Sequence, residues 1–267
     1  MRQVAETVAA EAAAHLRELP RPDAADPASV TTKSSPTDVV TANDTAVETL
    51  LRARLAQLRP GEPVVGEEAG GTGGDAVTWV VDPIDGTVNY LHGLPWYGVS
   101  VAAVLRGVVV AGAVAEPASG RLWSAAAGAG ATCDGRPLRV SGLTDLARAV
   151  IGTGFAYSAT RRAAQARMVA GMLPSIGDVR RAGSAALDLC AVAAGWLDGY
   201  VEHGTNWWDW GAASLVAAEA GAVVRVPGPP GAGAPDDGLG ADVVLAATPG
   251  IAAAFTELAR TLGAAEI

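Results

Sequence analysis

The longest apolar stretch of the chain, residues 99–115, is rich in valine and is broken near its middle by Arg106 and Gly107. Valine favours extended backbone because its branched side chain packs well on a pleated surface, and an Arg-Gly pair inside such a run is typical of a turn. A membrane-spanning helix would need about 20 apolar residues without such a break. The stretch therefore predicts two buried β-strands joined by a turn, and no membrane span.

Further helices and strands are expected on both sides of this pair, because apolar residues recur at helical or strand spacing along the chain. The expected helices cover residues 2–18, 47–58, 159–173, 184–195, 208–220 and 249–262. The expected strands cover residues 63–66, 77–81, 98–105, 108–114, 121–126, 149–153, 199–202, 222–226 and 242–246. This mixture predicts an α/β protein with layered helices and sheets.

A length of 267 residues suits one large domain or two fused halves with a shared core. No internal repeat or inter-domain linker is evident, and the Gly- and Pro-rich residues 227–240 predict a flexible surface loop. We therefore expect a single catalytic domain over residues 1–267. Its N-terminal half, 1–147, contains most of the candidate acids described below, and its C-terminal half, 148–267, contains the rest.

Composition and charge exclude several classes of protein. Half of the residues are hydrophobic and 18% are charged, as expected of a globular chain. The net charge of −9 argues against direct nucleic-acid binding, which requires a basic surface. Cys133 and Cys190 form no CxxC motif and the N-terminus does not resemble a signal peptide, so we expect reduced thiols and a cytoplasmic protein.

Residues 79–89, with the sequence WVVDPIDGTVN, carry two acids at the end of a hydrophobic strand. Pro83 prevents a simple continuation of the strand ladder after Asp82, and Asp85 follows one tight turn later. Two carboxylates with the Ile84 carbonyl between them form an oxygen cluster of the kind that Mg²⁺ prefers. A plain Asx turn at the end of a strand is the alternative interpretation.

Other acidic positions have ordinary explanations as well as chemical ones. Glu67 and Glu68 follow a strand and could be a solvated edge, whereas Asp209 begins an apolar helix and could cap it. Asp44 could balance the dipole of the helix that it begins. These roles do not exclude metal binding, because a capping acid can also face a metal.

Five blocks of the chain occur in the order and at the spacing of the inositol monophosphatase family, which the sequence resembles over nearly its whole length. The blocks are residues 33–44, 66–68, 82–89 and 208–221, and the pair 181–190 with 198–202. The resemblance implies that family's layered α/β/α/β/α sandwich. It also implies a homodimer, of which the spacing itself gives no sign.

The resemblance assigns roles to individual residues. It implies two or three Mg²⁺ ions, with ligands from Glu67, Glu68, Asp82, the Ile84 carbonyl, Asp85 and Asp209. Within this set, Glu68 would hold only a weakly bound third cation or its water. The residues implied in catalysis are Asp44, Glu67 and Thr87, of which Thr87, hydrogen-bonded to Asp44, would position the attacking water.

The remaining roles concern the substrate. The backbone amides of Gly86 and Thr87 would bind phosphate, because N–H groups at the start of a helix attract anions. The residues implied to face the rest of the substrate are Gly183, Ser184, Ala185, Glu202 and Asp209. Lys33, the only lysine of the chain, would belong to a mobile segment that folds over the metals.

The expected activity is the Mg²⁺-dependent release of phosphate from a small phosphorylated metabolite, in first place inositol 1-phosphate, with inhibition by Li⁺. Histidinol phosphate, fructose bisphosphate and adenosine bisphosphate are alternative substrates within the family. A non-catalytic role with the transcription machinery, as in some bacterial relatives, is a further alternative. The DxDx[TV], Cys-x5-Arg and GxSxG motifs of other hydrolases are missing, and the three histidines are unclustered.

Overall fold

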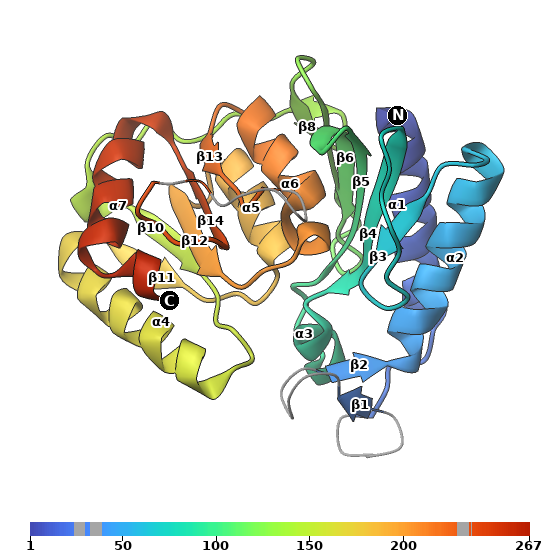
Figure 1. Ribbon diagram of the computed structural model, residues 1–267, viewed down its shortest axis with the longest axis horizontal. Helices are drawn as coiled ribbons and strands as arrows, with labels where there is room; N and C mark the ends of the chain where they lie inside the picture. The colour runs from blue at the N-terminus through green and yellow to red at the C-terminus, as the bar shows by residue number, and fades with distance from the viewer. Residues whose placement is uncertain (24–29, 33–38, 229–234, 236) are drawn as a thin grey trace.

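The computed structural model describes residues 1–23, 30–32, 39–228, 235 and 237–267. Helices and sheets alternate in five layers (Figure 1), so the predicted α/β/α/β/α sandwich is confirmed. Within these ranges, none of the helices combines the length and the apolar character needed to cross a membrane. Lys33 lies outside the described residues, as do residues 229–234 and 236 of the predicted loop.

The outermost helical layer on one side contains α1 (Arg2–Glu18) and α2 (Ala42–Leu58). These helices cover a seven-stranded sheet with the order β3-β4-β5-β6-β7-β8-β9, in which only β3 and β4 are parallel. Its strands are β3 (Val64–Gly66), β4 (Val77–Asp85), β5 (Gly98–Leu105), β6 (Val108–Ala115), β7 (Leu122–Ala126), β8 (Ala131–Cys133) and β9 (Arg136–Pro137). Strands β5 and β6 form the predicted hairpin, with Arg106 at φ 50° in its turn.

The middle layer contains α5 (Ala185–Ala193) and α6 (Trp207–Glu219), and the outer helices beyond the second sheet are α4 (Ala159–Met172) and α7 (Pro249–Thr261). The second sheet has the order β11-β10-β12-β14-β13. Its strands are β10 (Val150–Thr153), β11 (Asp178–Arg180), β12 (Gly199–His203), β13 (Val223–Arg225) and β14 (Val243–Ala247). The remaining elements are β1 (Val30–Thr32), β2 (Val39–Thr41), α3 (Thr87–His92) and the short 3₁₀ helices η1 (Leu146–Arg148), η2 (Leu173–Ser175) and η3 (Ala264–Glu266).

Three hydrophobic cores fill the spaces between the layers, one between the outer helices and the large sheet, one around α5 and α6, and one beneath α7. Small residues allow close packing in a chain with few aromatics. A Cβ atom on Gly112 of β6, for example, would lie 2.7 Å from the Cα of Ala212 in α6. This close approach fixes α6, and with it Asp209, against the large sheet.

Every helix and strand expected from apolar spacing is present, with ends displaced by a few residues at most. The sequence analysis missed β8, β9, β11 and the β1–β2 pair, because strands of two or three residues carry no recognisable period. Pro83 does not end β4, which continues to Asp85. The pairing of β4 with β5 is nevertheless irregular between Asp82 and Asp85, so the predicted break in the ladder is confirmed in a milder form.

Candidate active site

The two aspartates of β4 lie where its pairing with β5 changes register. Asp82 is opposite Ser100 and Asp85 is opposite Gly98, so β4 has one residue more than β5 between these pairs. This is a β-bulge, a feature that redirects side chains at the end of a strand. The Ile84 N–H donates to Asp82 Oδ1 at 2.9 Å, which fixes the carboxylate within the bulge.

The chain leaves β4 through Gly86 and begins α3 with the next residue. Gly86 has a φ of +96°, and a Cβ atom there would lie 3.1 Å from the carbonyl oxygens of Gly183 and Trp96. Left-handed backbone and close neighbours together require glycine. The first backbone amides of α3 therefore follow directly on the two aspartates.

Asp209 reaches the same place from the first turn of α6. Its Oδ2 accepts a hydrogen bond from the Asn206 N–H at 2.6 Å in a capping box, in which Asn206 is the N-cap. One carboxylate oxygen from each of Asp82, Asp85 and Asp209 lies within 4.8 Å of the others. Asn206, and not Asp209, is therefore the N-cap of α6, whereas Asp209 bonds back to that residue from the first turn and also joins the cluster.

Glu67 completes the acidic cluster. It shares a hydrogen bond with Asp82, and it lines the same cavity as Asp85 and Asp209. Burial raises the pKa of Asp82 well above its usual range, and the charges of Glu67, Asp85 and Asp209 add to this effect. Burial also raises the pKa of Asp85 to about 7 and raises that of Asp209 well above its ordinary value. Crowded carboxylates of this kind favour protons or cations between them.

Asp44 and Thr87 form a hydrogen bond next to this cluster. Thr87 Oγ1 lies 3.0 Å from Asp44 Oδ1 and 2.9 Å from the Ile84 carbonyl oxygen. Asp44 Oδ2 accepts hydrogen bonds from the Thr41 N–H at 2.9 Å and from its hydroxyl at 2.6 Å, which holds the carboxylate in the capping box of α2. Burial raises the pKa of Asp44 to about 6, although hydrogen bonds from Thr41 and Thr87 oppose the shift.

Asp85 links the cluster to the second half of the chain. Its Oδ2 accepts hydrogen bonds from the Ser184 hydroxyl at 2.5 Å and from the Ala186 N–H at 2.7 Å, at the start of α5. Ser184 is buried and also caps α5 through the Leu187 N–H. Its hydroxyl thus contacts an acid of the cluster, a contact that the sequence analysis did not expect.

A cavity of about 730 Å³ opens beside the acids, and Glu67, Asp85, Gly86 and Asp209 line it. Gly183, Ala185 and Glu202 line the same cavity. The Tyr200 hydroxyl donates to Glu202 Oε2 at 2.6 Å, and burial raises the pKa of Glu202. A cavity lined by the acids of the cluster and by a carboxyl group held in place by Tyr200 suits a polar ligand with a charged end.

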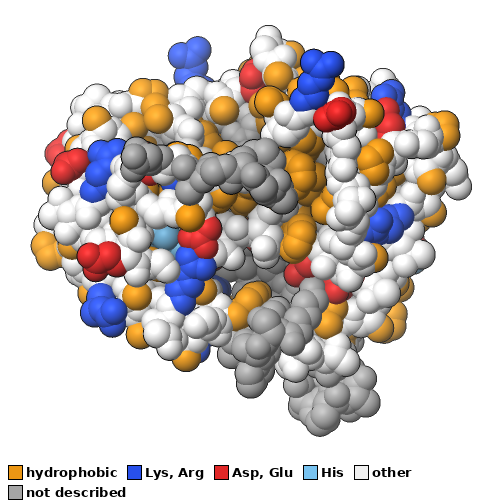
Figure 2. Space-filling view, viewed as in Figure 1, with side chains coloured by type: hydrophobic (Ala, Val, Ile, Leu, Met, Phe, Trp, Pro, Cys, Tyr) orange, Lys and Arg blue, Asp and Glu red, His pale blue; other side chains and the backbone are white. Residues whose placement is uncertain are grey.

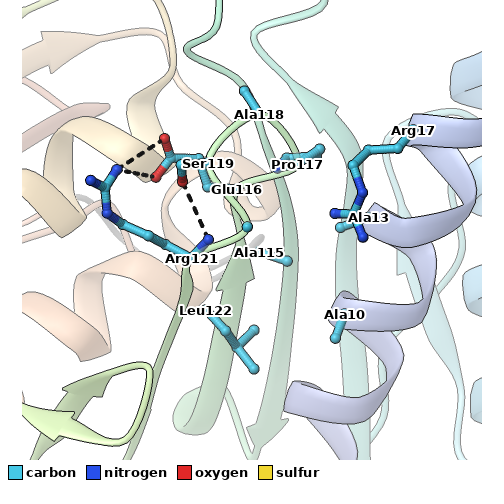
Figure 3. A pocket seen from close by; sticks show the side chains of 11 residues that line it. Ala10, Ala13, Arg17, Ala115, Glu116, Pro117, Ala118, Ser119, Arg121 and Leu122 are labelled. Carbon is cyan, nitrogen blue, oxygen red and sulfur yellow. Dashed lines mark hydrogen bonds and ion pairs between the residues drawn. The ribbon is translucent and has the colours of Figure 1, made fainter.

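A second cavity, of about 350 Å³, lies between α1 and the turn that follows β6 (Figure 3). Its charged residues are Arg17, Glu116 and Arg121, and Arg121 is paired with Glu116 at 3.4 Å. Since this cavity has a single acid, the carboxylate chemistry belongs to the larger one. Among the side chains coloured by type in Figure 2, Lys and Arg are scattered singly over the face rather than gathered into a basic stripe.

The structure brings together seven of the positions expected to hold metal or to act in catalysis: Asp44, Glu67, Asp82, Ile84, Asp85, Thr87 and Asp209. Glu68 is half-buried and is not among the residues that line the cavity. The sequence analysis missed Tyr200 and also Glu48, which contacts the backbone beside Glu67. Helical spacing could have found Glu48, because it lies four residues after Asp44 on the same side of α2.

This fold, with a buried acidic cluster beside a polar cavity, defines a class of metal-dependent phosphoric monoester hydrolases. The chain belongs to the inositol monophosphatase family, whose model matches residues 1–264. The inositol-1-monophosphatase of Mycobacterium leprae is 54% identical to it, over 100% of this chain and 96% of that protein.

Other similar proteins include one with a solved structure and one with a different name. The structure of Mycobacterium tuberculosis SuhB has a TM-score of 0.82 and 46% identity, and the match covers 98% of this chain and 97% of that one. The Nus factor SuhB of Pasteurella multocida is 40% identical over 73% of this chain and 74% of that protein.

Proposed function

We propose that the chain hydrolyses the phosphate monoester of a small hydroxyl-rich metabolite, in first place inositol 1-phosphate, with the help of Mg²⁺. The observation that carries the proposal is the convergence of Asp82, Asp85 and Asp209, whose oxygens lie within 4.8 Å of one another. The similarity to a protein named inositol-1-monophosphatase, at 54% identity, supports the choice of substrate.

The cluster fits two or three Mg²⁺ ions, because every candidate ligand is a hard oxygen. Asp82, Asp85 and Asp209 would share one ion, and Glu67, Asp82 and the Ile84 carbonyl would hold another, with Glu68 near a weaker third. The pKa of Asp82 is raised by burial and by its acidic neighbours, which is the state that bound cations would relieve. When bound, Mg²⁺ neutralises phosphate charge, activates water and stabilises the leaving oxygen.

The chain's own residues would orient the water and the phosphate. The Thr87 hydroxyl lies 3.0 Å from Asp44 and donates a hydrogen bond to that carboxylate. The lone pairs of the hydroxyl oxygen would then accept a hydrogen bond from the attacking water. Asp44, whose pKa is about 6, is then suited to take up the proton near neutral pH, with Glu67 close enough to add its charge. The amides of Gly86 and Thr87 would donate to the phosphate oxygens.

The substrate's hydroxyl groups would lie against Gly183, Ala185, Glu202 and Asp209, which line the same cavity as Glu67 and Asp85. Glu202 is held by Tyr200 and accepts hydrogen bonds from hydroxyl groups with its remaining lone pairs. Ser184 would contribute through the backbone turn and through Asp85, since its hydroxyl donates to that acid.

The experiment is a phosphate-release panel with inositol 1-phosphate, histidinol phosphate, fructose 1,6-bisphosphate and adenosine 3′,5′-bisphosphate, each with Mg²⁺ and with a chelator. We expect inositol 1-phosphate to have the highest kcat/KM and all release to stop in the chelator. A tenfold advantage for histidinol phosphate would make the substrate proposal wrong while leaving the chemistry intact. Release that is undiminished by the chelator would contradict the chemistry.

A second candidate function, association with the transcription machinery, is favoured by the relative named Nus factor SuhB at 40% identity. The replacement Asp82→Asn separates the two, because a scaffold keeps its biological effect when turnover is lost. We also propose that each chain forms one catalytic domain and that two chains form a homodimer. The protein would be cytoplasmic and would be inhibited by Li⁺. Size-exclusion chromatography with light scattering tests the homodimer.

A further inference from the structure

One side of α2 carries three charged residues at intervals of four, Asp44, Glu48 and Arg52. Side chains at this spacing lie above one another on a helix. Asp44 contacts Thr87 within the proposed catalytic machinery. Glu48 and Arg52 lie one and two turns further along the same side and contact a different segment.

Glu48 is nearly fully buried, with 2% of its surface exposed. Its Oε2 accepts a hydrogen bond from the Glu68 N–H at 2.7 Å, and its Oε1 accepts one from the Ala69 N–H at 3.0 Å. The Arg52 Nε donates to Oε1 at 2.8 Å. A buried carboxylate with two amides and a guanidinium is well satisfied, and charge-assisted bonds of this kind are the strong ones.

Arg52 contacts the end of the same segment and the strand that precedes it. Its guanidinium donates to the Val64 carbonyl at 3.0 Å and to the Gly70 carbonyl at 2.5 Å. The Gly66 N–H closes the segment through the Gly70 carbonyl at 3.0 Å. Residues 66–70 therefore form a loop whose ends are joined to each other, and α2 holds this loop through Glu68, Ala69 and Gly70.

The 66–70 loop packs closely against the Glu48 carboxylate. A Cβ atom on Gly66 would lie 2.5 Å from the Glu48 carboxyl carbon. Glu67, between Gly66 and Glu68, is thereby placed against Asp82, with which it shares a hydrogen bond. When both acids are ionised their charges repel, and a loop held by α2 opposes their separation.

We propose that Glu48 is a positioning residue, whose carboxylate holds the 66–70 loop and keeps Glu67 within the acidic cluster, so that the site binds Mg²⁺ tightly. This inference deepens the proposed function and rests on it. Partners that orient metal ligands commonly change metal affinity by about 10- to 100-fold when they are removed.

The test compares Glu48→Gln with the wild type and with Glu62→Gln. Glu62 is the control because its partners, Arg59 at 2.5 Å and Trp79 Nε1 at 2.7 Å, belong neither to the 66–70 loop nor to the acidic cluster. Mg²⁺ affinity is measured by calorimetric titration of the metal-free proteins. The Mg²⁺ dependence of phosphate release from inositol 1-phosphate is measured in parallel.

For Glu48→Gln we expect the Mg²⁺ dissociation constant to rise by about 10-fold or more, and kcat at saturating Mg²⁺ to return to within about 3-fold of the wild type. Glu62→Gln should bind Mg²⁺ as the wild type does. Equal Mg²⁺ affinity in Glu48→Gln and Glu62→Gln would overturn the inference. A wild type that binds no Mg²⁺ would instead contradict the proposed function.

Gly66→Ala gives an independent test that retains the Glu48 charge. The added methyl group displaces the Glu48 carboxylate from the loop amides, so Mg²⁺ affinity should fall as in Glu48→Gln. Circular dichroism establishes that each variant is folded. If Glu48→Gln does not fold, Gly66→Ala decides, and wild-type Mg²⁺ affinity in that variant contradicts the inference.

Discussion

At the residue scale, burial and neighbouring negative charges oppose the ionisation of the carboxyl groups in the site. Asp82 has three acidic neighbours that raise its pKa, and burial raises it further. Burial is also the largest cause of the raised pKa of Asp188, and the charges of Glu202 and Asp85 add to it. Asp188 is 1% exposed, and its Oδ1 accepts a hydrogen bond from Trp96 Nε1 at 3.0 Å. Burial raises the pKa of Asp188 well above its ordinary value of 3.8.

A buried acid of this kind makes stability depend on pH in a defined direction. Above pH 3.8 the unfolded Asp188 loses its proton, whereas the folded carboxyl retains it until its raised pKa is reached, so this residue's contribution to stability falls as the pH rises over that interval. The variant Asp188→Asn keeps an acceptor for Trp96 and removes the charge. It should be more stable than the wild type at pH 8 by about 1.4 kcal/mol for each unit of raised pKa, and little different at pH 4.

Urea denaturation of the metal-free protein at the two pH values measures this difference. Asp178→Asn is the control, because Asp178 is exposed and its hydrogen bond with Arg180 lowers its pKa. That variant should show no gain at pH 8. Equal stability of Asp188→Asn and the wild type at pH 8 would show that Asp188 ionises in the folded protein at no cost.

At the scale of elements, two short features determine the site. The bulge and the turn at Gly86 carry β4 into α3, and α2 approaches α3 through Asp44 and Thr87. Apolar spacing predicted β4 and α2, because both bury a continuous face. It could not predict that their ends meet, because a separation of 43 positions between Asp44 and Thr87 says nothing about their distance in space.

The contact between these elements makes a prediction about Thr87. Thr87→Val keeps the shape of the side chain and removes the hydroxyl that lies between Asp44 and the Ile84 carbonyl. We expect kcat to fall by about 10² to 10⁴, the usual contribution of a positioned proton acceptor, with a smaller change in Mg²⁺ affinity. Thr87→Ser, which retains the hydroxyl, should keep most of the activity.

Steady-state phosphate release with inositol 1-phosphate at saturating Mg²⁺ measures both variants. If Thr87→Ser loses as much activity as Thr87→Val, the hydroxyl alone is not sufficient, and the methyl group that Ser lacks is also needed to hold the side chain in place. If Thr87→Val remains fully active, the proposed water-orienting role is wrong.

At the scale of the whole molecule, the candidate site is assembled from both halves of the chain. Asp85 accepts hydrogen bonds at the start of α5, and Asn89 Nδ2 donates to the carbonyls of Trp96 and Ala182 at 2.7 and 2.8 Å. The acids could be identified in the sequence because five blocks occur together in order. Helical spacing could place Glu48 on the same side of α2 as Asp44, but it could not predict the proposed restraint on Glu67, because a Glu-Arg pair on a helix is more often a surface pair of little consequence.

The central claim is that these separate acids bind metal ions together, and a crystal grown with Mn²⁺ in place of Mg²⁺ tests it most directly. Anomalous diffraction locates Mn²⁺ without reference to activity. We expect at least two strong peaks, one among Asp82, Asp85 and Asp209 and one beside Glu67, Asp82 and the Ile84 carbonyl. Peaks confined to other parts of the surface, with none among these acids, would contradict the account.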